Sequence, residues 1–379
     1  MNPPHIDFNR AAPMGREMDY LAEAVRSARI SGNGPFTRRC EDLLRTQLGV
    51  ASVLLTSSGT HALDMTALLL DIKPGDEVII PSFTFVSTVN AFVLRGARPI
   101  FCDIRPDTLN LDERALPRLV SPRTRAIVPV HYAGVACEMD GILDLASRHG
   151  IAVIEDNAHG LYGRYRGRWL GTFGRMAAVS FHETKNITCG EGGALILNDA
   201  RDLARAEIIR EKGTDRTRFF RGEVDKYSWV DCGSSYVLSD MLAAFLWGQL
   251  ECRDQILAAR RRIWDGYAAR LGAWAVAHGV VLPAVPAHCE HPYHCFYLIL
   301  PTPDTRDGLL KHLRARGIHA VFHYLPLHLS TMGRAFGGVE GACPVTEDIS
   351  ARLLRLPFYN VLTDSDHSYV CDAVQRFSP

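Results

Sequence analysis

The chain has 379 residues, enough for two or three domains, and its 42 lysines and arginines balance 42 aspartates and glutamates. A summed charge of zero gives no reason to expect nucleic acid or an anionic membrane as partner, and it favours a small, locally recognised substrate. The ten cysteines form no CxxC pair, and no secretory leader or membrane-spanning stretch is visible. We therefore expect a cytoplasmic protein with reduced thiols.

Short apolar runs alternate with helix-like stretches over the first half of the chain. The helix-like stretches, at 62–70, 87–94 and 139–148, repeat apolar residues at every third or fourth position. The apolar runs are 53–55, 78–80, 100–104, 126–130, 152–154, 177–181 and 194–197. Such alternation predicts an α/β fold with a mostly parallel seven-stranded sheet, covered by helices on both faces.

The second half of the chain changes pattern. Residues 239–279 contain no proline and predict two abutting helices that leave the first domain. A strand, a helix, a strand and a last helix are expected at 295–300, 306–314, 319–324 and 365–377. This predicts a large domain over 1–250, with an N-terminal arm, and a small C-terminal α+β domain over 251–379.

Ligands of open α/β sheets bind beyond the carboxyl ends of the strands, so the residues after each apolar run are informative. Residues 56–63, Thr-Ser-Ser-Gly-Thr-His-Ala-Leu, lead from a strand into a helix. Free backbone N–H groups and a glycine there would cradle a phosphate, although an ordinary helix cap has the same pattern. Phe83 and Phe85 follow the next run, where they either stack on a flat heterocycle or lie in the core.

Titratable side chains follow two other runs. Asp156 and His159 come after the run at 152–154. A carboxylate in this position stays ionised beside a cation such as a protonated pyridine nitrogen, or else caps a helix. His131 follows the run at 126–130 and is either a site residue or a buried histidine with its own partners.

The last run before a glycine-rich turn leads to Lys185, one of five lysines in a chain with 37 arginines. Imine chemistry requires an amine that can lose its proton, and guanidinium stays protonated. One rim thus offers a phosphate cradle, a stacking aromatic ring, an acid for a ring nitrogen and an amine. Pyridoxal 5'-phosphate requires these four features, so we expect it as the cofactor.

Several segments resemble the DegT/DnrJ/EryC1/StrS sugar aminotransferases: 81–88, 129–140, 154–160 and 180–186. Others resemble the enterobacterial-common-antigen branch, the dTDP-4-amino-4,6-dideoxygalactose transaminases: 34–40, 210–216, 219–227, 233–236 and 321–328. The resemblance spans nearly the whole chain. It implies aminotransferase fold type I and a homodimer whose active sites lie at the subunit interface.

The same resemblance implies roles for single residues. Lys185 would bind the cofactor through an imine and act as the acid and base of the proton shift. The other cofactor contacts would be Gly59, Thr60 and Ser180 at the phosphate, Phe85 on the ring face, Asp156 at the pyridine nitrogen and His159 near the phenolic oxygen. Ser235 stands where many relatives donate an asparagine to the phosphate across the dimer. The nucleotide-sugar pocket would include Lys212, His323 and Tyr324.

The implied reaction transfers the amino group of L-glutamate to C4 of dTDP-4-keto-6-deoxyglucose, giving dTDP-4-amino-4,6-dideoxygalactose. The gluco epimer stays open, because the same catalytic groups serve transfer to either face. A PLP-dependent sugar dehydratase is less favoured, because in those relatives histidine replaces the lysine at position 185. A nicotinamide-dependent oxidoreductase would need a Gly-x-Gly-x-x-Gly turn, and residues 56–60 contain one glycine.

A metal-binding module is a further alternative, on the segment His-Cys-Glu-His-Pro-Tyr-His-Cys at 288–295. Its histidines and cysteines are ligands that zinc prefers. Their spacing matches no zinc-finger pattern, and the segment runs directly into a predicted strand. We therefore expect no metal in this protein.

Overall fold

The computed structural model of the chain describes residues 5–378, and its largest feature is a seven-stranded sheet. The strands are β1 (Ser52–Thr56), β2 (Glu77–Pro81), β3 (Arg98–Cys102), β4 (Thr124–Ile127), β5 (Ala152–Asp156), β8 (Met176–Ser180) and β9 (Gly193–Leu197). Their order across the sheet is β1-β9-β8-β5-β4-β2-β3. Strand β9 is antiparallel to both neighbours and the other pairs are parallel, so the predicted mostly parallel sheet is confirmed.

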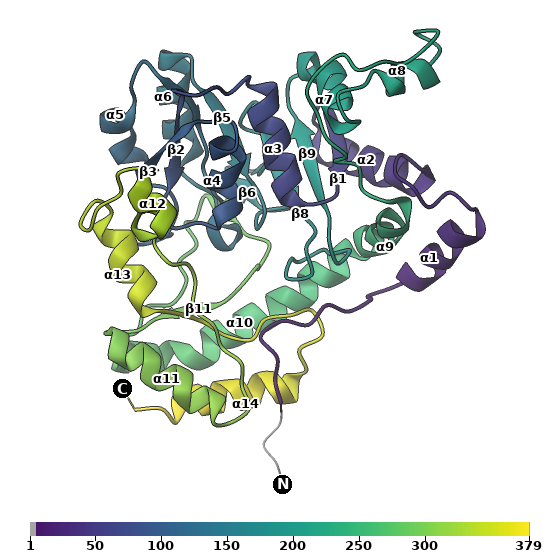
Figure 1. Ribbon diagram of the computed structural model, residues 1–379. Coiled ribbons are helices and arrows are strands. Elements are labelled where there is room, and N and C mark those ends of the chain that lie inside the picture. Colours follow the sequence, from purple (N-terminus) through teal and green to yellow (C-terminus); the bar gives the residue numbers. More distant parts are fainter. Residues whose placement is uncertain (1–4, 379) are drawn as a thin grey trace.

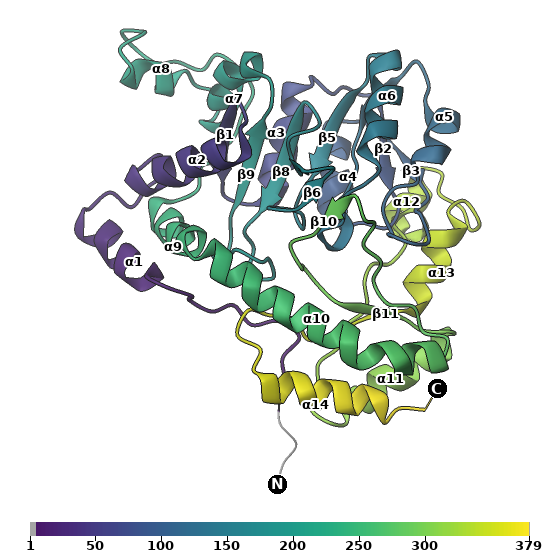
Figure 2. The ribbon, with the colours of Figure 1, turned by 180° about the vertical axis from the view of Figure 1, so that it is seen from behind.

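Helices cover both faces of this sheet. Up to residue 251 they are α1 (Glu17–Arg26), α2 (Pro35–Leu48), α3 (Gly59–Leu69), α4 (Val86–Val93), α5 (Leu116–Leu119), α6 (Met139–His149), α7 (Leu203–Arg210), α8 (Arg216–Phe220) and α9 (Asp240–Glu251). Helices α3 and α4 lie in front of the sheet in Figure 1. Helices α2 and α9 lie on the opposite face, which is the near side in Figure 2.

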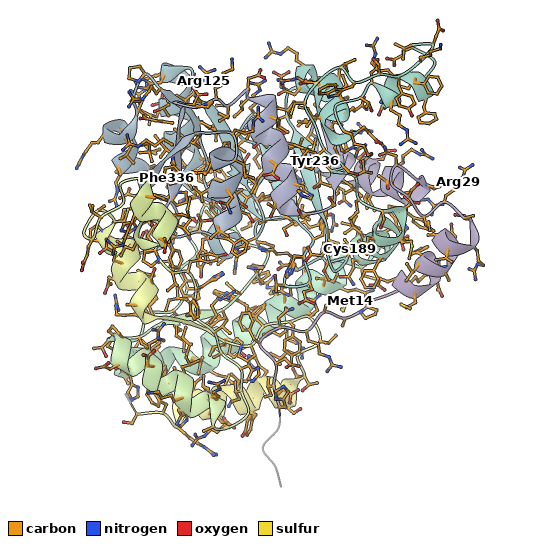
Figure 3. The ribbon with its side chains drawn as sticks, in the orientation of Figure 1. Met14, Arg29, Arg125, Cys189, Tyr236 and Phe336 are labelled. Carbon is orange, nitrogen blue, oxygen red and sulfur yellow. The ribbon has the colours of Figure 1, made fainter. Side chains whose placement is uncertain are left out.

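Two apolar layers hold these helices to the sheet, because successive strand residues point to opposite faces. In β2, Val78 and Ile80 pack in the layer with α3 and α4, whereas Ile79 packs with α6 on the other side. Figure 3 labels Tyr236 from the first layer, and Cys189, which packs with α2 and α9. Burial on both faces explains why the strands are continuous apolar runs in the sequence.

The long helix-compatible stretch forms two helices, as predicted. Helix α9 ends at Glu251, and α10 (Arg253–Ala277) begins after Cys252 and runs below the sheet (Figures 1 and 2). Within residues 5–378, no helix combines the length and the apolar character needed to cross a membrane.

A second core lies around α10. Helices α11 (Pro303–Arg314) and α14 (Asp364–Gln375) pack there, with β11 (Tyr297–Ile299) paired to β12 (Leu353–Arg355). Ile6, from the N-terminal arm, is buried in this core. The short elements are β6 (Arg164–Tyr165), β7 (Arg168–Trp169), β10 (Cys289–Glu290), α12 (Thr331–Ala335), α13 (Pro344–Arg352), η1 (Glu113–Ala115), η2 (Tyr132–Gly134), η3 (Ala200–Asp202) and η4 (Leu327–Leu329). The division into domains near residue 250 stays a prediction.

The predicted strand at 319–324 is wrong. This segment forms a single bridge, from Val321 to Arg355, and continues as irregular chain. Its three successive apolar residues, 320–322, do not form a buried strand. His323 is buried because it lines a cavity, whereas Phe322 is exposed. Pro326, which has no N–H to donate, follows closely.

Candidate active site

The carboxyl ends of the central strands open into a cavity of about 450 Å³. Its lining comes from the sheet, from residues such as Phe358 of the second core, and from Phe8 and Asn9 of the N-terminal arm. Nine of the predicted site residues line it: Gly59, Thr60, Phe85, Asp156, His159, Ser180, Lys185, His323 and Tyr324. Residues spread over more than 260 positions therefore share one pocket, as the rule for the strand ends of α/β sheets predicts.

Lys185 lies in the turn that follows β8, where its backbone N–H donates to the carbonyl of His182 at 2.9 Å. Its side chain is partly buried and points into the cavity. Burial, opposed by the negative charge of Asp156, lowers the pKa of Lys185 to about 8. An appreciable fraction of this amine is therefore unprotonated near neutral pH.

Asp156 ends β5 and is buried. Its Oδ2 accepts a hydrogen bond from Thr88 Oγ1 at 2.7 Å, and its Oδ1 accepts one from the backbone N–H of Ala158 at 3.1 Å. Thr88 is in turn hydrogen-bonded to Thr84 at 2.9 Å. Across the described chain, no lysine, arginine or histidine nitrogen lies within 4.0 Å of this carboxylate. Neutral donors thus hold a buried charge that remains available to a cationic ligand.

The start of α3 forms a cradle for an anion. Ser58 caps the helix, since its side chain accepts from the His61 N–H at 3.0 Å. The N–H groups of Gly59 and Thr60 precede that bond and, in the part of the chain described, have no acceptor. A Cβ on Gly59 would stand 2.9 Å from the Ser180 Cβ, so only glycine lets the helix start so close to β8. Backbone donors and side-chain hydroxyls therefore face one space, as in phosphate sites.

The two aromatic residues after β2 have different environments. Phe83 is 1% exposed and packs on Tyr132, with ring centroids 5.1 Å apart, so it belongs to the core. Phe85 is 57% exposed and lines the cavity. A large, exposed aromatic side chain at a pocket mouth is suited to stack on a flat ring.

Histidines form one wall of the cavity. His159 stacks on His294, with centroids 4.0 Å apart and planes at 18°, and within residues 5–378 its buried Nδ1 has no hydrogen-bond partner. Burial, together with the charges of Lys185 and Arg355, lowers the pKa of His159 well below its usual value. His323 shares a hydrogen bond of 3.1 Å with the Tyr132 hydroxyl. These imidazoles are therefore neutral, and His159 keeps a free ring nitrogen for a ligand.

Several lining residues were not predicted from the sequence: Phe8, Asn9, Thr88, His294, Arg355 and Phe358. Most of them come from the N-terminal arm and the second core. Asn9 Nδ2 donates to the Glu183 carbonyl at 3.1 Å, which ties the arm to the Lys185 turn. No local pattern marks these residues, because their proximity to Lys185 arises only from the tertiary fold.

Two predicted residues lie elsewhere in the single chain. Ser235 and Lys212 line a second cavity, of about 990 Å³, near α2, α7 and α8. The Lys212 N–H donates to the Ser234 carbonyl at 2.9 Å, so the two segments run side by side.

His131 is a buried histidine with its own partners. Its Nδ1 accepts from the Cys137 N–H at 3.2 Å, and its Nε2 bonds Glu155 Oε2 at 3.0 Å. It does not line the pocket. The structure thus favours the second of the two interpretations that the sequence left open.

The histidines of the segment at 288–295 each have a different neighbour. His288 bonds Glu138 at 3.0 Å, His291 packs edge-on against Trp264, and His294 stacks on His159. Within residues 5–378, three potential metal ligands come together at His5, Asp7 and His319. This group lies outside the pocket and outside the segment at 288–295.

Comparison with known proteins agrees with this geometry. The model of the DegT/DnrJ/EryC1/StrS aminotransferase family matches residues 14–375. MJ1066 of Methanocaldococcus jannaschii, described as uncharacterized, is 33% identical over 367 residues, 95% of this chain and 94% of that protein. The structure of the aminotransferase TlmJ from Streptoalloteichus hindustanus is 30% identical, with a TM-score of 0.90 and 98% of each chain covered. DesV of S. venezuelae is 32% identical, with a TM-score of 0.86, over 96% of this chain and 95% of that one. This chain therefore belongs to the DegT/DnrJ/EryC1/StrS aminotransferase family.

Proposed function

We propose that this protein is a PLP-dependent nucleotide-sugar aminotransferase. In this proposal it transfers the amino group of L-glutamate to C4 of dTDP-4-keto-6-deoxyglucose and produces dTDP-4-amino-4,6-dideoxygalactose. Membership of the family supports amino transfer and the cofactor. One observation carries the proposal: the Lys185 amine, the buried Asp156 carboxylate and the open start of α3 face the same cavity.

The residues present fit pyridoxal 5'-phosphate. When bound, this cofactor supplies an aldehyde that condenses with amines and a ring that withdraws electrons from the reacting carbon. Lys185 would hold it through its amine, and Asp156 would face its ring nitrogen. The free N–H groups of Gly59 and Thr60, with the Ser180 hydroxyl, would bind the phosphate. The exposed ring of Phe85 would lie on its face, and the unpartnered Nδ1 of His159 is a donor or acceptor for its phenolic oxygen.

The chain's own groups divide the work of proton transfer. Because its pKa is lowered to about 8, the Lys185 amine can accept a proton at Nζ and return it near neutral pH. Hydrogen bonds from Thr88 and the Ala158 N–H hold the Asp156 carboxylate in place, where it would face the ring nitrogen of the cofactor. His159 and His323 are buried, so the wall that they form would shield the reacting atoms from water on that side.

The proposal includes a homodimer with shared active sites. Ser235 and Lys212 line their own cavity, away from Lys185, so the assigned roles require these residues to reach the pocket of a second copy. That cavity also carries Arg38, Arg45, Arg216 and Arg221. The cavity also carries Glu41, Asp42, Glu207 and Glu211, and Arg45, Arg216 and Arg221 form ion pairs with three of these acids, so its charge is mixed.

The galacto product rests on resemblance, through the segments 210–216, 219–227 and 321–328. The gluco epimer remains the alternative, since the configuration at C4 depends on how the hexose is held and the catalytic groups are the same. A sugar dehydratase is a weaker alternative, because Lys185 is retained.

The test is incubation of the enzyme with pyridoxal 5'-phosphate, L-glutamate and dTDP-4-keto-6-deoxyglucose, followed by NMR of the sugar. An axial amine at C4 is the expected product. An equatorial amine would select the gluco alternative, and a deoxygenated ketone would select the dehydratase. An unchanged keto-sugar would refute the proposed substrate.

A further inference from the structure

Arg355 is a cation in the active-site cavity that has no role in the cofactor binding and proton transfer described above. It ends β12 and its side chain lines the pocket beside His323, Tyr324 and Phe358. Asp156 and Glu191 are the carboxylates of this lining. Asp156 is held by neutral donors, and Glu191 lies 3.6 Å from His182.

The guanidinium of Arg355 has few partners within the protein. Its backbone is fixed by two hydrogen bonds with Val321, of 2.7 and 3.1 Å. The guanidinium carbon lies 4.6 Å above the centre of the Phe8 ring, and one terminal nitrogen donates a long bond of 3.4 Å to the Phe322 carbonyl. Its buried Nε has no acceptor anywhere in residues 5–378, and no carboxylate of that part lies within 4.0 Å of the side chain. A rigidly placed arginine with unused donors is suited to bind an anion.

Arg355 also acts on the reacting groups. Burial is the main cause of the low pKa of His323, and the positive charge of Arg355 is the next. Burial is also the main cause of the lowered pKa of Lys185 and of His159, and the charge of Arg355 contributes to both. For His159 the charge of Lys185 contributes more than that of Arg355. Arg355 and Lys185 line the same cavity, so an anion bound at Arg355 would share that cavity with the Lys185 amine.

We propose that Arg355 binds the α-carboxylate of the amino-acid donor, in a subsite formed with the Phe8 ring. This inference rests on the proposed function, since it concerns the donor of that reaction. In an α-amino acid the carboxylate is attached to the carbon that bears the reacting nitrogen, so it must lie near Lys185. The diphosphate of a nucleotide sugar is attached to C1, across the hexose ring from C4, and must lie farther away.

The test uses the holoenzyme and measures the two half-reactions separately. The pyridoxal form is mixed with L-glutamate, L-alanine or 4-aminobutyrate, and the pyridoxamine form is mixed with the keto-sugar. L-Alanine keeps the α-carboxylate and lacks the second one, whereas 4-aminobutyrate lacks the α-carboxylate. Arg355→Gln should slow L-glutamate and L-alanine about 10- to 100-fold more than 4-aminobutyrate and the keto-sugar, the effect of one charged hydrogen-bonded contact. The last two rates report the effect of the lost charge on Lys185 alone.

An equilibrium measurement accompanies the rates. The pyridoxal form binds 2-oxoglutarate without reacting, and calorimetric titration should show a similar 10- to 100-fold weaker Kd in Arg355→Gln. Arg355→Lys should recover part of the loss, because it keeps the charge without the paired donors. Arg314→Gln, at an exposed arginine of α11 in the same part of the molecule, should behave like wild type.

Each other outcome overturns the inference. If Arg355→Gln reacts more slowly with L-glutamate and 4-aminobutyrate but not with L-alanine, Arg355 binds the second carboxylate of L-glutamate instead. Slowing of the keto-sugar alone would assign it to the diphosphate, and no change in any rate would leave it without a ligand. If wild type reacts with no amino acid, the proposed function fails and the inference fails with it. A reactive wild type with an unaffected variant refutes the role of Arg355 alone.

Discussion

The lowered pKa of Lys185 predicts how the cofactor-free enzyme captures pyridoxal 5'-phosphate as pH changes. Only the unprotonated amine attacks an aldehyde. With a pKa of about 8, roughly one Lys185 side chain in eleven is unprotonated at pH 7. For an ordinary lysine, with a pKa of about 10.4, the fraction is roughly one in 2,500. The structure thus implies an advantage of about 200-fold at pH 7 from the pKa alone.

The assay mixes the cofactor-free enzyme with pyridoxal 5'-phosphate at a series of pH values, traps the adduct with borohydride and quantifies the Lys185 peptide. The capture rate should rise about tenfold per pH unit below 8 and level off above it. Asp156 opposes the lowering, so in Asp156→Asn the rate should level off at a lower pH. A rate that still rises steeply beyond pH 9 would refute the reasoning, because the amine would then titrate as an exposed lysine does.

Further substitutions test stability, the cradle, the stacking ring and the dimer. Folding lowers the pKa of Lys185 from about 10.4 in the unfolded chain to about 8. The charged Lys185 therefore destabilises the fold below pH 8, and this effect decreases as the pH rises toward about 10.4. The free energy of unfolding of cofactor-free Lys185→Gln, measured with denaturant at pH 7, should then be higher than that of wild type by on the order of 2–3 kcal/mol. Equal free energies of unfolding would contradict this. Gly59→Ala should cost about 1–3 kcal/mol and weaken cofactor binding, whereas Gly272→Ala, whose added methyl meets nothing within 4 Å, should stabilise the protein in thermal unfolding. Phe85→Ala should lower cofactor affinity about 2- to 10-fold in a fluorescence titration and leave unfolding almost unchanged, since Phe85 is 57% exposed. Lys212→Ala and Lys185→Arg, each expected to be impaired, should regain activity when their subunits are mixed, and no recovery would argue against shared sites.

Much of the fold could be predicted because the sheet is buried on both faces. Successive residues such as Ile79 and Ile80 are buried in opposite layers. The strands are therefore continuous apolar runs, which are visible in the sequence. The segment at 319–324 has a similar apolar content, but Ala320 packs in the second core and His323 lines the cavity. The sequence pattern does not distinguish such burial from that of a strand. The segment was therefore wrongly predicted as a strand.

The same contrast applies to the pocket. Asp156 and Lys185 could be predicted because Asp156 ends one strand and Lys185 follows another strand of the same sheet, and the carboxyl ends of parallel strands meet at one edge. Arg355 and Phe8 could not, because they reach the pocket from a short strand and from the N-terminal arm, through packing of distant segments. Ser235 and Lys212 line a separate cavity of the single chain, so their proposed contribution to the site concerns a second copy of the chain.

In the proposed reaction an amino group passes from an amino acid to a sugar carbon, and Lys185 holds the cofactor and moves the protons. The most direct measurement supplies ¹⁵N-labelled L-glutamate and dTDP-4-keto-6-deoxyglucose to wild type and to Lys185→Arg, and detects nitrogen bonded to the sugar by NMR. We predict ¹⁵N on C4 with wild type, and none with a Lys185→Arg protein that retains the wild-type circular dichroism. Label on the sugar at an equal rate with Lys185→Arg, or a wild-type product without ¹⁵N, would contradict the account.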